Sequence, residues 1–282
     1  MTKDTFFRTK ISLNCRGTLR QWNRPLVMGI LNVGPDSFYD GGRYVQAEAA
    51  LKQTERMLKE GADIIDIGAV STKPGAEIPE TGEEMRRLMP VLEALMQAFP
   101  GILVSVDTFR SAVAQAALQA GASIINDVYA GRFDPGILTA AAEHHAPLIL
   151  MHMQGDPHHM QDHPQYDNVV SEVLQFLARQ ALLAHQAGVD DIIIDPGFGF
   201  GKSRDHNFEL LSGLGHFVAS PYPVLAGMSR KSMINQTLGI KAADALNGTS
   251  VLNTVALMKG ASLIRVHDVK EAVQAIRLLS NL

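Results

Sequence analysis

Short apolar runs rich in Ile, Val and Leu recur along the chain, and each is too brief to form a helix. The runs do not alternate with polar residues, which is typical of strands that are buried on both faces of a parallel sheet. Eight runs of this kind occur, at residues 26–32, 63–68, 103–107, 123–127, 147–152, 191–197, 223–229 and 263–268. We therefore expect a parallel sheet that is covered by helices.

Helical periodicity separates the apolar runs. Residues 47–61 and 268–279 carry apolar side chains every three or four positions, and Gly61 is placed to end the first of these helices. The predicted inner faces consist of Ala47, Ala50, Leu51, Thr54 and Leu58 in one helix and Val269, Ala272, Val273, Ile276 and Leu279 in the other. Strands that alternate with helices over roughly 250 residues fit a closed barrel better than an open doubly wound sheet. The predicted fold class is α/β, a single (β/α)8 TIM barrel.

The chain shows no internal boundary. It lacks a Ser-, Gly- or Pro-rich linker, a low-complexity tract and a repeat of fixed period. Residues 1–282 are therefore predicted to form one barrel domain. Residues 1–25 precede the first barrel strand as an extension, in which residues 6–21 are predicted to form a short N-terminal β-hairpin that covers the lower end of the barrel.

Composition narrows the choice of partners. The 282 residues carry a net charge of −4, so nothing favours general binding to nucleic acid or to anionic membranes. Cys15 is the single cysteine, which excludes intrachain disulfides and thiolate metal clusters and suits a reducing compartment. The N-terminus lacks the apolar core of a signal peptide, and no apolar run of about 18 residues follows it. We expect a cytoplasmic protein that acts on small molecules.

Polar residues stand at the end of each predicted strand. The carboxyl ends of barrel strands converge on one mouth, where barrel enzymes place their chemistry. The strand-end residues are Asn32, Asp66, Asp107, Asn126, Asp127, His152, Asp195, Ser229, Arg265 and His267. Any single Asn or Asp could simply end a strand and cap the next helix. Together they predict a polar site at the barrel mouth.

Arg265 and His267 form the most informative pair, because residues two apart on a strand face the same side. Two donors of this kind suit a phosphate or a pyrophosphate. In the alternative interpretation, Arg265 pairs with a strand-end aspartate, and His267 is a core histidine whose hydrogen bonds are satisfied within the protein.

The segment "DPGFGFGKS" (195–203) resembles a Walker A loop. Pro196, however, stands where that loop requires its first glycine, so the interpretation fails. The glycines are better explained by a close approach of the backbone, and of the Phe198 or Phe200 ring, to a flat ligand.

The segment "GMSRKS" (227–232) brings a hydroxyl and two positive charges to the mouth, those of Ser229, Arg230 and Lys231. We expect one of the charged residues to be solvated and another to bind an anion or a carbonyl group.

Taken in order, these motifs resemble those of the dihydropteroate synthase family over essentially the whole chain. The similar segments are "GILN", "PDSFYDGG", "STKPGA", "SVDT", "IINDV", "LMHMQG", "DPGFGFGK", "GMSRKS" and "IRVHDV". The resemblance implies a transferase of folate synthesis that joins 6-hydroxymethyl-7,8-dihydropterin pyrophosphate to p-aminobenzoate, giving 7,8-dihydropteroate and pyrophosphate. It also implies a homodimer, a requirement for Mg²⁺ and a target of sulfonamides.

The same resemblance implies a role for each site residue. The pterin would be bound by Asp107, Asn126, Asp195, Lys231 and Met151. The pyrophosphate would be bound by Asn32, Arg265 and His267, with Asn32 also a ligand of Mg²⁺. The p-aminobenzoate pocket would be formed by Phe38, Thr72, Lys73, Pro74, Phe200 and Ser229. The catalytic residues would be Lys231, Arg265, His267 and Asp107.

Three positions depart from the family pattern, with Gly34 in place of threonine, Val70 in place of glutamate and Lys73 in place of arginine. All three fall in the two loops that are expected to close over p-aminobenzoate. They motivate a second hypothesis, a pterin-binding relative that couples p-aminobenzoate weakly or not at all. A third hypothesis is a pterin-dependent methyltransferase domain. Arg265 and His267 argue against it, because a methylfolate donor brings no pyrophosphate.

Overall fold

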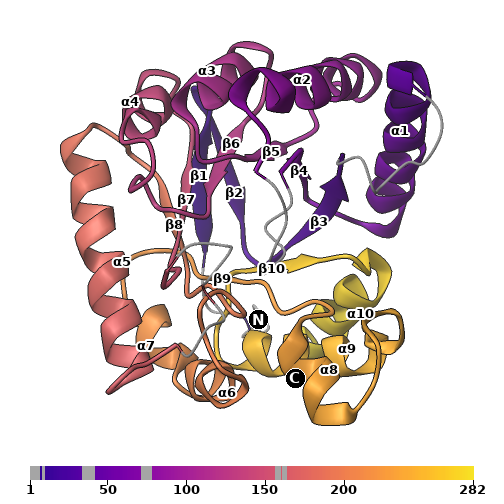
Figure 1. Cartoon of the computed structure of the whole chain (residues 1–282). Helices are drawn as coiled ribbons and strands as arrows, with labels where there is room; N and C mark the ends of the chain where they lie inside the picture. Colours follow the sequence, from indigo (N-terminus) through magenta and orange to yellow (C-terminus); the bar gives the residue numbers. More distant parts are fainter. Residues whose placement is uncertain (1–6, 8–9, 34–41, 71–77, 156–159, 161–163) are drawn as a thin grey trace, which may run out of the picture.

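A parallel sheet of eight strands, in the order β8-β7-β6-β5-β4-β3-β10-β9, lies at the centre of the protein (Figure 1). The computed structural model describes residues 7, 10–33, 42–70, 78–155, 160 and 164–282. The strands are β3 (Leu26–Asn32), β4 (Ile64–Gly68), β5 (Val104–Asp107), β6 (Ile124–Asp127), β7 (Leu148–Met151), β8 (Ile192–Asp195), β9 (Leu225–Ala226) and β10 (Leu263–Val266). Each predicted apolar run contains one of these strands.

The sheet closes on itself between β8 and β9. A parallel bridge joins Ile194 to Val224, and the Ile194 N–H donates to the Pro223 carbonyl at 3.0 Å. β9 has only two residues; Pro223 just before it has no N–H to add to the ladder. The predicted (β/α)8 barrel is confirmed.

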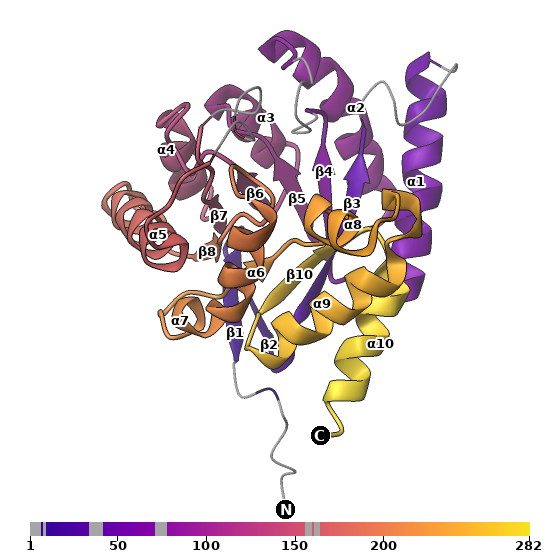
Figure 2. The ribbon, with the colours of Figure 1, turned by 60° about the horizontal axis from the view of Figure 1, so that its bottom comes forward.

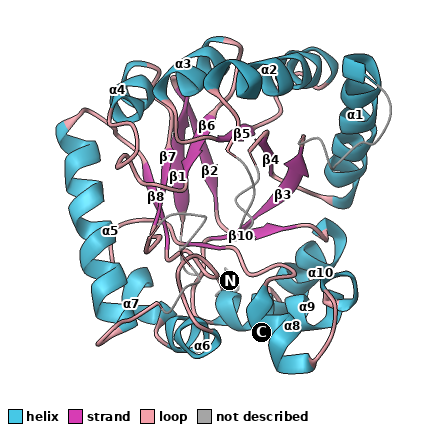
Figure 3. Cartoon of the chain, in the orientation of Figure 1, coloured by secondary structure: helices cyan, strands magenta, loops and turns pink. Residues whose placement is uncertain are grey.

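Helices surround the barrel on its outer side (Figure 3). They are α1 (Gly42–Glu60), α2 (Thr81–Ala98), α3 (Ser111–Gln119), α4 (Gly136–Glu143), α5 (Val169–Gln186), α6 (Arg204–Ser212), α7 (Leu214–Val218), α8 (Ser232–Leu238), the 3-10 helix η1 (Ala242–Asp244), α9 (Leu246–Met258) and α10 (Val269–Leu279). Among the described residues, no helix is both long and apolar enough to cross a lipid bilayer.

The helices pack on the sheet through the faces that their periodicity predicts. Ala50 and Thr54 of α1, and Ala272 and Ile276 of α10, are buried. α1 also buries Met57, which the sequence analysis did not include in the inner face. The apolar layer between helices and strands is the larger part of the core, and it leaves the strand ends free to carry polar groups.

A hairpin of β1 (Ile11–Cys15) and β2 (Thr18–Trp22) precedes the barrel, as predicted. Ile11 and Leu13 are each 1% exposed. They belong to one apolar cluster with Leu26 and Leu263, which begin β3 and β10. The hairpin therefore covers the end of the barrel where the strands start, and Figure 2 shows it at that end.

The two leucines of the hairpin give a matched test of this covering role. Leu13→Ala is expected to lower the free energy of unfolding by about 2–5 kcal/mol, because it leaves a cavity at the barrel end. Leu19→Ala is the control, because Leu19 is 63% exposed on the opposite strand. Urea unfolding of both variants measures the difference. Equal losses would show that the hairpin does not contribute to the core.

Candidate active site

The centre of the barrel mouth is an ion-pair network around Arg265, at the end of β10. Arg265 Nε donates to Asp66 Oδ2 at 2.6 Å, and its Nη2 donates to Asp107 Oδ2 at 3.1 Å. Asn126 Nδ2 lies 3.3 Å from the same Asp66 oxygen. One guanidinium thus joins the ends of β4, β5 and β10, and Asn126 connects β6 to them.

Burial makes this network electrostatically strong. Asp66 is 0% exposed. Burial raises the pKa of Asp107 to about 7, although the charge of Arg265 opposes that rise. Burial alone would lower the pKa of Arg265, but Asp66 and Asp107 reverse this effect and hold its pKa above the usual value. The guanidinium is therefore permanently charged and shared between two carboxyl groups.

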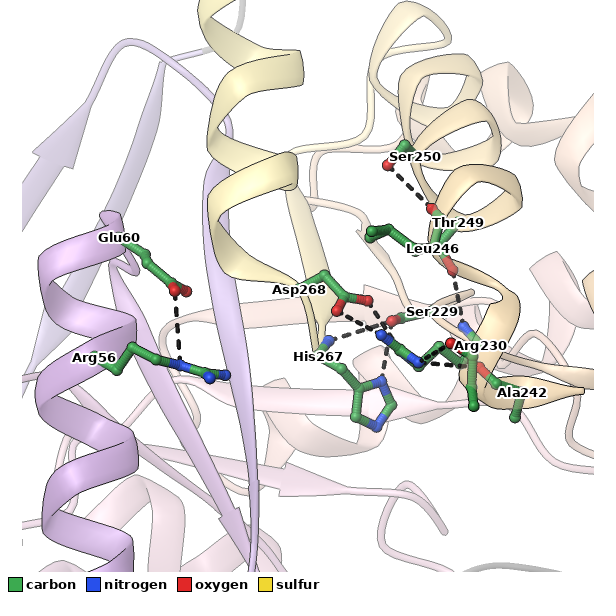
Figure 4. A network of polar contacts seen from close by, with 11 residues as sticks. Arg56, Glu60, Ser229, Arg230, Ala242, Leu246, Thr249, Ser250, His267 and Asp268 are labelled. Carbon is green, nitrogen blue, oxygen red and sulfur yellow. Dashed lines mark hydrogen bonds and ion pairs between the residues drawn. The ribbon is translucent and has the colours of Figure 1, made fainter.

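This geometry settles the alternative left open for Arg265, which does pair with strand-end aspartates. His267, in contrast, is an exposed residue and not a core histidine. Its Nδ1 lies 3.0 Å from Ser229 Oγ, which also accepts the His267 backbone N–H at 3.2 Å (Figure 4). Partial desolvation and the charge of Arg265 lower the pKa of His267, so the ring is neutral at pH 7. The donor and acceptor of this pair depend on the tautomer of the ring. In the tautomer whose Nδ1 accepts the Ser229 hydroxyl, the ring proton is on Nε2, which is then a donor.

Asp195 and Lys231 form a second buried group of opposite charges at the mouth. Asp195 Oδ1 accepts the Gly197 N–H at 2.7 Å, and burial raises the pKa of Asp195. Burial lowers the pKa of Lys231 to about 8, although Asp195 opposes the change. Lys231 Nζ donates to the Phe198 carbonyl and lies 4.6 Å from the centre of the Phe200 ring. Lys231 is therefore presented beside an aromatic surface.

Backbone conformation after β8 depends on glycine. Gly197 has a φ of 71°, and a Cβ there would lie 1.9 Å from the His152 carbonyl oxygen. Gly201 has a φ of 61°, and its Cβ would lie 2.3 Å from the Gln154 carbonyl oxygen. The close approach that was predicted is therefore an approach to the loop after β7. Whether a flat ligand also uses it stays a prediction.

Arg230 is neither solvated nor free to bind a ligand. It has a φ of 58°, its Nη2 and Nε donate to the Asp268 carboxylate at 2.7 and 3.0 Å, and its Nη1 donates to the Ala242 and Ala243 carbonyls (Figure 4). Arg230 therefore binds carbonyl groups of the protein itself, and which charge of this segment binds a ligand stays a prediction. Its contacts tie the loop of Ser229 and Lys231 to the end of β10.

Two strand-end residues have other surroundings. Asp127 accepts the N–H groups of Tyr129 and Gly131 at 2.8 and 2.6 Å, so it caps its own loop. Met151, at the end of β7, is 3% exposed and lies in an apolar cluster against which Phe200 and Val70 pack.

Asn32 is exposed at the end of β3 and lines a hollow of about 550 Å³ between β3 and α1. Lys52 and Arg56 line the α1 side of this hollow. Five residues of the two loops that are expected to close over p-aminobenzoate lie outside the described residues. They are Gly34, Phe38, Thr72, Lys73 and Pro74.

Sequence reasoning missed two residues that organise the mouth. Asp66 was placed at a strand end but was given no role, although it receives Arg265. Lys202 was passed over when the Walker A interpretation failed, yet it is only 2% exposed and contacts the loops after β7 and β8. A buried charge in a glycine-rich segment was the available signal for Lys202.

Comparisons with known proteins agree with this geometry. A family model described as "Pterin binding enzyme" matches residues 28–267. The dihydropteroate synthase of Escherichia coli (strain K12) is 45% identical over 271 residues, which cover 95% of this chain and 95% of that protein. The chain belongs to the dihydropteroate synthase family. The resemblance is confirmed, and with it the prediction of a transferase that makes dihydropteroate.

Two solved structures of dihydropteroate synthases extend the comparison. The Yersinia pestis enzyme, in a complex with a sulfonamide drug, has a TM-score of 0.90 and 43% identity, covering 96% of this chain and 98% of that one. The Xanthomonas albilineans enzyme, with 4-aminobenzoic acid, has a TM-score of 0.88 and 45% identity, covering 96% and 97%. Both enzymes share the barrel over nearly its full length.

The shared guanidinium leads to a prediction about stability and pH. Arg265→Met is expected to lower the free energy of unfolding by about 3–5 kcal/mol, because it leaves buried carboxyl groups without their cation. The native pKa of Asp107, about 7, exceeds the usual value of 3.8, so the native state binds more protons and stability falls as pH rises through that window. Without Arg265 the pKa of Asp107 rises further, so the fall extends above pH 7.

Urea unfolding of Arg265→Met and the wild type at about pH 6 and about pH 8.5 checks the direction of this effect. The variant is expected to lose more free energy of unfolding at the higher pH. Arg24→Met is the control. It removes the ion pair of Arg24 with Asp63, which lies beside the start of β3, and its deficit should be the same at both pH values. A loss of free energy of unfolding in Arg265→Met that did not grow with pH would refute the proposal that Arg265 compensates the buried carboxyl groups.

Proposed function

We propose that the chain condenses 6-hydroxymethyl-7,8-dihydropterin pyrophosphate with p-aminobenzoate at the barrel mouth, and that the residues named from the sequence bind these substrates. The observation that carries the proposal is the arrangement around Arg265. Half-buried Asp107 on β5 and buried Asn126 on β6 and Asp195 on β8 lie at the strand ends of the same mouth as the exposed residue His267 on the β10 side. The first group suits a pterin, and the second suits its pyrophosphate.

A pterin presents ring N–H groups and an amide edge, which require both acceptors and donors. Asp107 and Asp195 supply acceptors, Asn126 supplies an amide and Lys231 supplies a donor. All four lie at strand ends or in the loop just beyond β9. Met151, buried in the apolar cluster at the end of β7, would contact the flat face of the ring. This chemistry supports the proposed pterin site.

The pyrophosphate would lie between Arg265, His267 and Asn32. His267 would donate from Nε2 and Arg265 from its guanidinium. The exposed amide oxygen of Asn32 fits Mg²⁺, which prefers oxygen ligands and takes few from protein when a substrate phosphate supplies others. When bound there, Mg²⁺ would neutralise charge on the pyrophosphate. The described residues contain no cluster of three or more His, Cys, Asp or Glu that could hold a metal, so we propose Asn32 as the protein ligand.

The reaction then needs no protein nucleophile. The bond from the exocyclic carbon to the pyrophosphate oxygen breaks as Arg265 and His267 stabilise the charge that develops on that oxygen. The electron-rich pterin, held by Asp107 and Lys231, stabilises the cation left on the carbon. The amine of p-aminobenzoate attacks this carbon and then loses a proton. Phe200 and Ser229, together with Phe38, Thr72, Lys73 and Pro74, would orient the amine and exclude water.

We also propose that the chain acts as one domain, in the cytoplasm, and as a homodimer that is sensitive to sulfonamides. Exposed apolar side chains on α8 and α9 support self-association. Leu238, Val251 and Met258 are 53%, 52% and 58% exposed, and apolar side chains exposed together on neighbouring helices are typical of an interface.

Incubation of the protein with the pterin pyrophosphate, p-aminobenzoate and Mg²⁺ tests the function, and we expect dihydropteroate and pyrophosphate in equal amounts. Asp195→Asn keeps the shape but turns an acceptor into a donor that faces pterin N–H groups. We expect it to weaken pterin binding by about 1–3 kcal/mol. Pterin pyrophosphate binding without product would favour the non-coupling relative. Methyl transfer from a methylfolate would favour the methyltransferase.

His267→Ala separates the pyrophosphate site from the pterin site. Loss of the Nε2 donor is expected to weaken binding of the pterin pyrophosphate by about 1.5–3 kcal/mol, the value of a hydrogen bond to a charged group. Binding of free 6-hydroxymethylpterin should stay nearly unchanged. Calorimetry with both ligands checks this, and His216→Ala on the outer helix α7 is the control. Equal losses for the two ligands would contradict the assignment.

A further inference from the structure

Lys202 lies in the loop between β8 and α6 and is 2% exposed. Its Nζ lies 2.8 Å from the Gly197 carbonyl oxygen, 2.9 Å from the Phe200 carbonyl oxygen and 2.9 Å from His152 Nδ1. It also lies 3.3 Å from the His152 carbonyl oxygen. Two acceptors therefore belong to the loop of Lys202 itself, and two belong to the residue just after β7.

The electrostatics agree with a donor in this position. Burial, followed by the charges of Lys202 and Arg132, lowers the pKa of His152 to about 2, so the ring is neutral and its Nδ1 can accept. Burial lowers the pKa of Lys202 well below its usual value, while Asp195 opposes that change, so burial disfavours the charged form of this amine. An apolar side chain would fill the same space without the cost of burying an amine. The set of acceptors indicates that the amine is there to bind carbonyl groups.

The carbonyl groups that Lys202 holds belong to the part of the loop that faces the mouth. The Phe200 carbonyl binds Lys202, while the Phe200 ring lies 4.6 Å from Lys231 Nζ. The Tyr166 hydroxyl donates to the Gly201 carbonyl at 2.8 Å and fixes the loop from its outer side. The position of the Phe200 ring therefore depends on the contacts that Lys202 and Tyr166 make with the backbone carbonyls of Phe200 and Gly201.

The elements on either side of the loop do not need Lys202. The carboxylate of Asp195, which ends β8, accepts the Gly197 N–H. α6 begins with a capping box, in which the Ser203 side chain accepts the His206 N–H and the His206 ring accepts the Ser203 N–H. A change at Lys202 is thus expected to loosen the loop while the strand and the helix remain.

We propose that Lys202 is a positioning residue, which holds the Phe200 ring in the wall of the p-aminobenzoate pocket by tying the Gly197 and Phe200 carbonyls to the loop after β7. The inference rests on the proposed function, because it assigns Phe200 to p-aminobenzoate. It adds a specificity role for a side chain that touches neither substrate.

Lys202→Met tests the anchor by two independent measurements. Hydrogen exchange of the amides of residues 197–201 should accelerate by about tenfold, because the loop loses the amine that binds its carbonyl groups. The KM for p-aminobenzoate should rise by about tenfold, while the Kd of 6-hydroxymethylpterin changes by less than about threefold. The matched control is Lys259→Met, since Lys259 also donates to a carbonyl, that of Ser212 at 2.9 Å, but at an exposed site. The control should change neither quantity.

A double-mutant cycle with Phe200→Ala shows whether Lys202 acts through the ring. If it does, Lys202→Met adds little to the KM for p-aminobenzoate once the ring is absent. Tyr166→Phe is the second variant, because it removes only the hydroxyl that binds Gly201 and keeps the ring. It should accelerate exchange in the same amides and raise the same KM by about threefold.

If Lys202→Met raises the KM for p-aminobenzoate by the same factor with and without the Phe200 ring, the proposal is overturned. An equal weakening of p-aminobenzoate and pterin binding would also overturn it. If Lys202→Met does not fold, unchanged exchange and an unchanged KM in Tyr166→Phe would overturn it. An inactive wild-type protein would count against the proposed function alone, because the exchange measurement still tests the anchor.

Discussion

The sharing of one guanidinium between two carboxyl groups is the constraint on which the barrel mouth depends. Asp66 and Asp107 project from neighbouring strands into a space with little water, where two carboxyl groups repel each other unless a cation separates them. Arg265 supplies that cation from β10, 199 residues away from Asp66 along the chain. The site therefore depends on the pairing of β10, the last strand in the sequence, with β3, the first, because this pairing brings Arg265 within reach of β4 and β5.

The side chains of Arg230 and Lys202 hold the loops of the barrel mouth in place. Arg230 binds Asp268 and so connects the loop after β9 to the end of β10. Lys202 connects the loop after β8 to the loop after β7. The polar groups of both side chains are used within the protein, so they fix the geometry of the loops and leave His267 exposed at the mouth. The polar side chains of this site thus divide into those that build it and those that remain available to a ligand.

Sequence reasoning was strongest where a local pattern has one structural meaning. Unalternated runs such as 191–197 were predicted as strands because a sheet that is covered on both faces buries such side chains. The pairing of Arg265 was stated only as an alternative, and Asp66 received no role, because the pairing of distant residues leaves no local trace. Lys202 was missed for a related reason, since its acceptors are carbonyl groups, which every residue carries. Phe38, Thr72, Lys73 and Pro74 lie outside the described residues, and their roles stay predictions.

The hairpin at the start of the barrel has a consequence for the order of folding. Its residues Ile11 and Leu13 precede every barrel strand in the sequence, but the cluster that buries them includes Leu225 and Leu263, which belong to the last two strands. The apolar face of the hairpin is therefore fully covered only after these two strands have been synthesised. Contacts of such long sequence separation form slowly. The hairpin, which precedes the barrel strands in the sequence, is therefore among the last parts of the barrel to reach its place, and its docking reports that the barrel has closed.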